Sequence, residues 1–245
     1  MEHILRVTFI GLVSGMVGTS IGGLMAFFIR DISNRTLGFI LEFSAGLMTA
    51  VVCFELIPEA FKIGGNVLGF LGIGIGVCTL MIIEDFVKRM ESLRRNNRSG
   101  LLRAGILMAI GIALHNFPEG FAVGSGFEAS IKLGVTLTAV IMIHDVPEGI
   151  AIAVPLRVGG VSKMKAFLLT VLSGVPMGFG AFFGAVLGDI SPSFIALCLG
   201  FAGGAMLYVV YGELVPESKR LYFGRLSSLG NILGIICGII VSVYN

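Results

Sequence analysis

The sequence predicts an all-α membrane protein with eight transmembrane helices in a 3+2+3 inverted-repeat arrangement, and three observations predict this fold. The 245-residue chain is 56% hydrophobic and only 13% charged, with a mean hydropathy of +0.98, whereas soluble domains carry about 25% charged residues. Its apolar residues fall into eight stretches, each near the roughly 20 residues that a helix needs to cross a bilayer. Segments in the first half of the chain also match segments in the second half.

The eight expected spans form a single transmembrane domain that covers 1–245. They are 5–28, 36–57, 66–87, 102–125, 132–154, 165–188, 194–215 and 227–244. The first is longer than the roughly 7–15 apolar residues of a signal peptide, so we expect it to be a membrane span. The longest connection, 88–101, is rich in basic residues, and we expect a cytoplasmic loop there.

Positive charges predict how the chain is oriented. With the N-terminus on the outer side, 14 of the 17 Lys and Arg residues fall in segments on the cytoplasmic side. Because cytoplasmic loops carry the excess of Lys and Arg, we expect a multi-pass protein of the plasma membrane with both termini on the non-cytoplasmic side. The net charge of +2 gives no reason to expect a nucleic-acid partner. The partner that the composition implies is the lipid bilayer.

Four pairs of segments indicate an internal repeat. The second and seventh spans share FSAGLMTAVVCFELIPEA (43–60) and FAGGAMLYVVYGELVPES (201–218), and the fourth and fifth share HNFPEG (115–120) and HDVPEG (144–149). Shorter matches join the first span to the sixth and the third to the eighth. The members of each pair have opposite orientations in the predicted topology. Such inverted repeats are typical of secondary transporters, whose substrate site lies near the bilayer midplane.

The two central spans carry ionisable side chains near their middles. In each span, a His and a Glu four residues apart lie on one helical face, one turn from each other. The residue after each His, an Asn or an Asp, points to an adjacent face. Pro118 and Pro147 each remove a backbone donor and so free a carbonyl beside these side chains. The candidate metal ligands are therefore His115, Asn116, Glu119, His144, Asp145 and Glu148.

Ionisable groups at this depth need a partner of opposite charge. An Asp at the centre of a span costs about 2.5–3.5 kcal/mol on insertion scales, and no Lys or Arg of the sequence lies at the depth of these carboxylates. A cation is the expected partner. Imidazole nitrogen with carboxylate oxygen suits Zn²⁺, and also Fe²⁺, Mn²⁺ or Cd²⁺. A single intramembrane His can instead form an interhelical hydrogen bond, but duplication of the whole motif favours a metal site.

The repeat and the polar motif together predict a secondary transporter of divalent metal ions rather than an enzyme, with Zn²⁺ as the first expected cargo. The alternatives are an intramembrane metal-dependent enzyme and a proton channel. The zinc-protease motif HExxH, whose Glu acts as the general base, is absent from the sequence. His, Asn and carboxylates clustered together also exceed what proton conduction needs.

Two further symmetric pairs lie in the second and seventh spans. Glu55 and Glu213 are placed toward opposite ends of these spans by the predicted topology, and we hypothesise that they are relay or gate carboxylates at the two mouths of the path. The alternative is solvation at helix ends. Met48, the counterpart of Met206, could supply a soft thioether ligand, although core packing is the more common role of Met.

The motifs HNFPEG (115–120) and HDVPEG (144–149), in a chain of eight predicted spans, resemble those of the ZIP (Zrt/Irt-like) metal transporters, most of all their short prokaryotic members. The resemblance covers essentially the whole chain. It implies uptake of Zn²⁺ and related divalent ions toward the cytoplasm. It also implies that the first, fourth, fifth and sixth spans move against the other four. Glycine pairs at GxxxG spacing in the first and third spans fit either such motion or the interface of a homodimer.

The resemblance further implies two adjacent metal sites on the fourth and fifth spans. By position, the first comprises His115, Glu119 and Glu148, and the second comprises Asn116, Asp145 and the same two glutamates. His144 matches a family position that is often His or Gln. Many members carry a Glu in the sixth span where this chain has Met177. The second site is therefore expected to lack one carboxylate, which argues against its being fully occupied.

Overall fold

The structure, a computed structural model, describes residues 1–28, 33–93 and 100–244, and within these residues the chain forms helices and no strands. The helices are α1 (Glu2–Phe28), α2 (Asn34–Val51), α3 (Ile57–Leu93), α4 (Gly100–Ala129), α5 (Ile131–Val158), α6 (Lys163–Ser173), α7 (Val175–Gly188), α8 (Pro192–Val209), α9 (Val215–Leu221) and α10 (Arg225–Tyr244). Two π-helical turns, η1 (Val52–Leu56) and η2 (Val210–Leu214), join α2 to α3 and α8 to α9. The all-helical class expected from the sequence is confirmed for the described residues.

Six helical stretches among the described residues are long and apolar enough to cross a membrane. One of them, Asn34–Asp85, has 52 residues and contains two of the predicted spans. Within it, Gly65 adopts a φ of 72° and a ψ of 174°, a non-helical backbone that divides α3. Helix α4 contains the predicted span 102–125 but is not one of the six. The predicted basic loop 88–101 is shorter than expected, because 88–93 belong to α3 and 100–101 belong to α4. Its centre, 94–99, lies outside the described residues.

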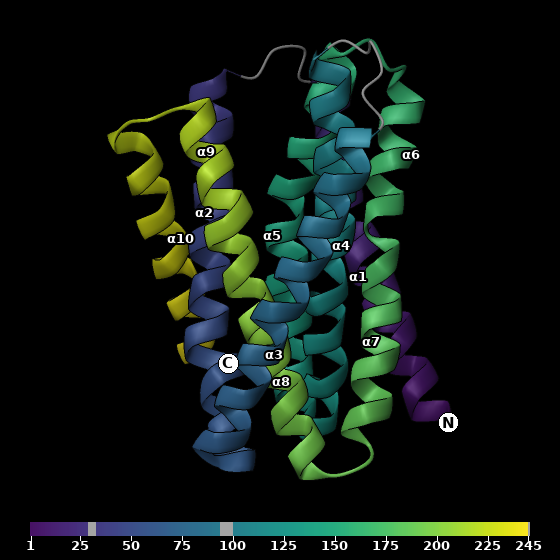
Figure 1. Cartoon of the computed structure of the whole chain (residues 1–245), viewed down its shortest axis with the longest axis vertical. Coiled ribbons are helices and arrows are strands. Elements are labelled where there is room, and N and C mark those ends of the chain that lie inside the picture. The colour runs from purple at the N-terminus through teal and green to yellow at the C-terminus, as the bar shows by residue number, and fades with distance from the viewer. Residues whose placement is uncertain (29–32, 94–99, 245) are drawn as a thin grey trace.

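The helices form an elongated bundle with α4 and α5 near its middle (Figure 1). Helix α4 packs on α5 and α7, and α1 packs on the same two helices. A second set pairs α2 with α10 and α3 with α8. Contacts between α2 and α5 and between α4 and α8 join the two sets. The polar motifs of α4 and α5 are therefore enclosed by neighbouring helices rather than exposed at the edge of the bundle.

Close packing in the first set depends on glycines of α1. A Cβ on Gly15 would lie 2.7 Å from the carbonyl oxygen of Gly174, at the junction of α6 and α7. A Cβ on Gly18 would lie 2.5 Å from the Cβ of Asp145 in α5. Such distances are too short for any side chain, so glycine lets α1 approach both neighbours at backbone distance.

The two π-helical turns occupy equivalent positions in the matched segments. η1 carries Glu55 and η2 carries Glu213, and each turn is followed two residues later by a proline, Pro58 or Pro216. In each, an N–H just past the turn reaches the carbonyl five residues earlier, as from Ile57 to Val52. π-Helical turns are rare and often lie at functional sites. Their equivalent placement agrees with the repeat seen in the sequence.

Candidate metal site

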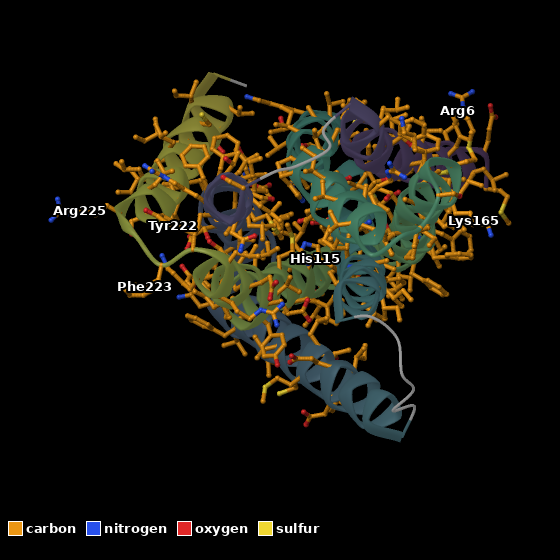
Figure 2. All side chains as sticks on the ribbon, turned by 90° about the horizontal axis from the view of Figure 1, so that it is seen from above. Arg6, His115, Lys165, Tyr222, Phe223 and Arg225 are labelled. Atoms are coloured by element: carbon orange, nitrogen blue, oxygen red, sulfur yellow. The ribbon has the colours of Figure 1, made fainter. Side chains whose placement is uncertain are left out.

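The polar residues of α4 and α5 meet inside the bundle, and His115 lies near the centre when the molecule is viewed along its long axis (Figure 2). Four of the predicted ligands, His115, Glu119, His144 and Glu148, offer ligand atoms that all lie within 4.8 Å of one another. The side chains of these four residues are at most 2% exposed. Two motifs that are 29 residues apart in the sequence therefore form one buried cluster.

Glu119 is the centre of this cluster. Its Oε1 lies 3.1 Å from Nε2 of His115, one turn earlier in α4, and 2.6 Å from Nε2 of His144 in α5. His115 Nε2 also lies 3.3 Å from Oε1 of Glu148. Each imidazole thus faces a carboxylate of the opposite helix. The helical spacing of His and Glu explains the contact within α4, and the packing of α4 on α5 supplies the others.

These distances suit a metal ion. A zinc ion binds imidazole nitrogen and carboxylate oxygen at about 2.0–2.2 Å, so two ligand atoms in tetrahedral positions lie roughly 3.3 Å apart. The separations from His115 Nε2 to the two carboxylates, 3.1 and 3.3 Å, are close to that value. Small side-chain movements would let the four groups close around one ion. In the described part of the chain, the two imidazoles are the only chargeable donors paired with these carboxylates.

Asn116 and Asp145 lie beside the four clustered residues and are completely buried. Asn116 Nδ2 donates to the backbone carbonyl of Ser173 at 2.7 Å, while its Oδ1 has no hydrogen-bond partner among the described residues. Asp145 Oδ1 lies 3.6 Å from His144 Nε2, and neither oxygen of Asp145 has a hydrogen-bond partner among those residues. Buried polar atoms are usually paired. Unpaired oxygens next to the cluster are what a cation would bind.

Met177 is fully buried in the first turn of α7. Its sulfur lies 3.8 Å from the hydroxyl of Ser14, and it would be 2.7 Å from a Cβ on Gly15. The thioether of α7 is therefore packed against α1.

The two predicted relay carboxylates have different surroundings. Glu213 Oε2 lies 3.3 Å from the position that a Cβ on Gly111 would take. Gly111 precedes His115 by four residues, so Glu213 approaches α4 one turn away from the cluster, on the same face. Glu55 is partly exposed in η1. Sequence symmetry pairs these two glutamates, but the structure brings Glu213 toward the predicted ligands of α4.

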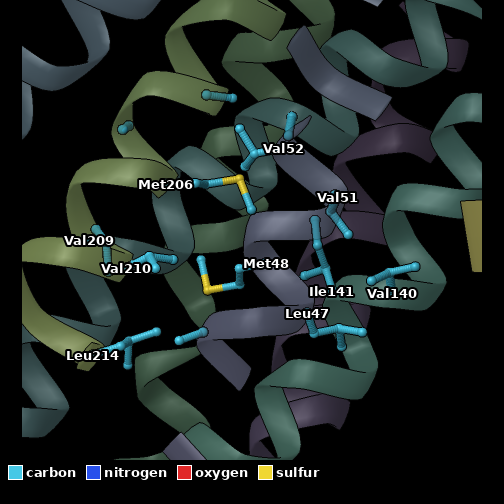
Figure 3. Packing of buried hydrophobic residues seen from close by; sticks show 14 of the residues in the cluster. Leu47, Met48, Val51, Val52, Val140, Ile141, Met206, Val209, Val210 and Leu214 are labelled. Carbon is cyan, nitrogen blue, oxygen red and sulfur yellow. The ribbon is translucent and has the colours of Figure 1, made fainter. Parts of the chain in front are cut away.

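Met48 and Met206 are buried in the main apolar cluster, where their side chains lie between α2 and α8 (Figure 3). Leu47 and Ile141 belong to the same cluster. The surroundings of Met48 fit the packing role that Met usually has.

Sequence reasoning missed several polar contacts between helices. Glu42, 2% exposed in α2, pairs with Lys219 of α9 at 2.9 Å and accepts a hydrogen bond of 2.9 Å from Asn231 of α10. Tyr208 of α8 donates to Glu84 of α3. Acidic residues inside apolar spans were the available signal, but without the tertiary contacts their partners could not be named.

Comparison with known proteins places the motifs in a family context. The family pattern described as "ZIP Zinc transporter" matches residues 89–244, which include both central motifs. The chain is 33% identical to the zinc transporter ZupT of Akkermansia muciniphila, over 99% of this chain and 98% of that protein. It is 36% identical to ZupT of Chlorobium limicola, over 89% and 90% of the two chains. It is also 34% identical to the zinc transporter GufA of Myxococcus xanthus, over 70% and 69%.

Proposed function

We propose that this chain, which belongs to the ZIP family of zinc transporters and carries divalent metal ions across a membrane, has Zn²⁺ as its cargo. We propose further that the ion passes through the buried cluster of His115, Glu119, His144 and Glu148. The observation that carries this proposal is the cluster itself, whose four ligand atoms lie within 4.8 Å of one another. The chain is a transporter and not an enzyme, so the cluster holds its ion only in passage.

The mixed ligand set supports Zn²⁺ as the main cargo. Two imidazole nitrogens and carboxylate oxygens match the borderline character of Zn²⁺, and they also accept Fe²⁺, Mn²⁺ and Cd²⁺. The relatives named above are zinc transporters. We extend that cargo to this chain.

A second, adjacent cation site is part of the proposal. It consists of Asn116 and Asp145 together with oxygens of Glu119 and Glu148. Its support is the set of buried oxygens without hydrogen-bond partners among the described residues, which includes Asn116 Oδ1, both oxygens of Asp145 and Glu119 Oε2. Because Met177 occupies the place of a further carboxylate, this site binds its ion more weakly than the first.

Eight spans in a 3+2+3 inverted repeat are the proposed membrane arrangement. The non-helical Gly65 divides the 52-residue stretch Asn34–Asp85 into two crossings, and α4, 30 residues long, supplies another. The equivalent turns η1 and η2 support the pairing of the second and seventh spans. Both termini then lie on the non-cytoplasmic side of the plasma membrane, the basic segment 88–101 lies in the cytoplasm, and the ion moves inward. A homodimer, embedded in lipid, is the proposed assembly.

Glu213 and Glu55 are the proposed relay carboxylates at the inner and outer mouths. The approach of Glu213 to Gly111 supports the inner position, since an ion that leaves His115 toward the cytoplasm meets this carboxylate one helical turn away. Glu55 is proposed for the outer mouth from symmetry.

Radiometal uptake into proteoliposomes tests the function. We expect wild-type protein to accumulate ⁶⁵Zn²⁺ and the variants His115→Ala and Glu148→Ala to lose nearly all uptake. Glu59→Gln is the matched control, because Glu59 carries the same charge but pairs with Lys62 at the surface. Unchanged zinc flux in both cluster variants would overturn the site. Proton flux without metal flux in the wild type would favour a proton channel instead.

A further inference from the structure

The sixth predicted span is broken between α6 and α7, beside Asn116. Gly174 separates the two helices, and the N–H of Met177 donates to the Gly174 carbonyl at 3.2 Å, a step of three residues. In an unbroken α-helix that N–H would bond the Ser173 carbonyl, four residues earlier. Pro176 has no N–H to continue the helical pattern either. The break therefore leaves the Ser173 carbonyl open to a donor from outside its own helix.

That donor is the side-chain amide of Asn116. The hydrogen bond from Asn116 Nδ2 to the Ser173 oxygen measures 2.7 Å and joins buried residues of α4 and α6. A backbone carbonyl can only accept, so it decides which end of the amide faces it. With the nitrogen fixed on Ser173, the oxygen must point elsewhere. Asn116 Oδ1 has no hydrogen-bond partner in the described part of the chain.

The break is held in place by glycines of two neighbouring helices. A Cβ on Gly15 of α1 would lie 2.7 Å from the Gly174 carbonyl oxygen. A Cβ on Gly120 of α4 would lie 2.8 Å from the Cα of Met177. Both contacts are at backbone distance, so the Ser173 carbonyl is set by packing on α1 and α4. Asn116 lies one turn before Gly120 on α4, which keeps donor and acceptor in register.

We propose that the α6–α7 break is a positioning device, in which the Ser173 carbonyl orients the Asn116 amide so that its oxygen, rather than its nitrogen, is presented to the transported cation. This inference rests on the proposed function, and it names what sets one ligand of the second cation site. Oxygen ligands suit Mn²⁺ more than they suit Zn²⁺, which accepts imidazole well. The device therefore raises the flux of Mn²⁺ relative to that of Zn²⁺.

Asn116→Asp separates positioning from simple ligation. An ionised Asp carries oxygen at both positions but cannot donate to the Ser173 carbonyl, so the two oxygens repel each other and the side chain is no longer held in place beside the cation. We expect Asn116→Asp and Asn116→Leu both to lower the Mn²⁺/Zn²⁺ uptake ratio by about tenfold, near the upper limit for losing one neutral hydrogen bond. If Asn116→Asp keeps or raises that ratio, donation to Ser173 is not required and the positioning role is wrong.

A double-mutant cycle tests whether the break acts through Asn116. Pro176→Ala restores an N–H and lets the helix continue, so Met177 N–H competes for the Ser173 carbonyl. We expect Pro176→Ala to lower the Mn²⁺/Zn²⁺ ratio in the wild-type background and to leave it unchanged in the Asn116→Leu background. Pro155→Ala, which removes another proline inside a helix, is the matched control and should leave the ratio unchanged in both.

The outcomes distinguish this inference from the proposed function. Equal effects of Pro176→Ala in both backgrounds, or no effect in either, would refute the positioning role. Should Pro176→Ala fail to fold, as judged by its size-exclusion profile, the comparison of Asn116→Asp with Asn116→Leu decides alone. Normal zinc flux in His115→Ala would instead refute the site on which the inference rests, whatever the ratio shows.

Discussion

Helices α4 and α5 carry the same motif with one polar difference, and the structure surrounds the two positions differently. Asn116 of α4 donates to the Ser173 carbonyl of α6. Asp145 of α5 packs against Gly18 of α1, and its two oxygens have no hydrogen-bond partner in the described part of the chain. An amide donates and accepts, whereas an ionised carboxylate only accepts. Asn116 is thereby tied to the backbone, whereas both oxygens of Asp145 stay open to accept.

The glutamates of the two motifs are also unequal. Glu119 of α4 contacts both imidazoles through the same oxygen, at 3.1 and 2.6 Å. In the described ion pairs, Glu148 of α5 contacts His115 alone. The duplicated motif therefore contains one carboxylate that both imidazoles share, Glu119, and one peripheral carboxylate, Glu148, that contacts a single imidazole. The comparison teaches that sequence symmetry predicts which residues gather, while the packing of the neighbouring helices decides the role of each.

The largest expected effect concerns the shared carboxylate. Glu119→Gln removes the one oxygen that both imidazoles approach, so we expect zinc uptake to fall by at least about 100-fold, the upper range for loss of even an outer partner of a metal ligand. Asp145→Asn, a matched change of a buried acid in α5, should lower zinc uptake less. Both are measured by initial rates of ⁶⁵Zn²⁺ uptake in proteoliposomes. Equal losses would show that Glu119, the carboxylate shared by the two imidazoles, matters no more to zinc uptake than another buried acid beside them.

The imidazoles provide the next comparison. His115 lies near both glutamates, whereas His144 contacts Glu119 and, more distantly, Asp145. The family resemblance also places His144 at a position where Gln occurs. We expect His115→Gln to raise the apparent KM for Zn²⁺ by about tenfold more than His144→Gln, within the range for perturbed metal ligation. A larger effect of His144→Gln would reverse the order assigned to the two helices.

Much of this arrangement was predictable from the sequence. Spacing of four residues placed His115 and Glu119 on one face, and the matched motif predicted the partner helix. The helical class followed from hydropathy. The hydrogen bond of Asn116 could not be predicted, because it depends on where the break beside Ser173 falls against α4. The pairing of Glu42 with Lys219 was missed for the same reason, since it joins helices that are distant in sequence.

The smallest expected effect extends the comparison to the symmetric turns η1 and η2. Glu213 approaches Gly111, one turn from His115 on α4, whereas Glu55 is paired with it only by sequence symmetry. We expect Glu213→Gln to lower the maximal zinc uptake rate by about threefold, matching a partly solvated charge interaction of roughly 0.2–1 kcal/mol. Glu55→Gln should change the maximal rate less and act mainly on KM at low external zinc.

Gly111→Ala tests the same approach from the side of α4. The added Cβ would lie 3.3 Å from Glu213 Oε2, tight enough that the carboxylate must shift slightly away from α4. We expect a reduction of the maximal rate similar to that of Glu213→Gln, and no further reduction when the two changes are combined, since they act on one contact. Additive losses would show that Gly111 and Glu213 act separately. The difference between α4 and α5 would then concern only their candidate ligands, because the maximal rate of zinc uptake would not depend on the contact between Glu213 and α4.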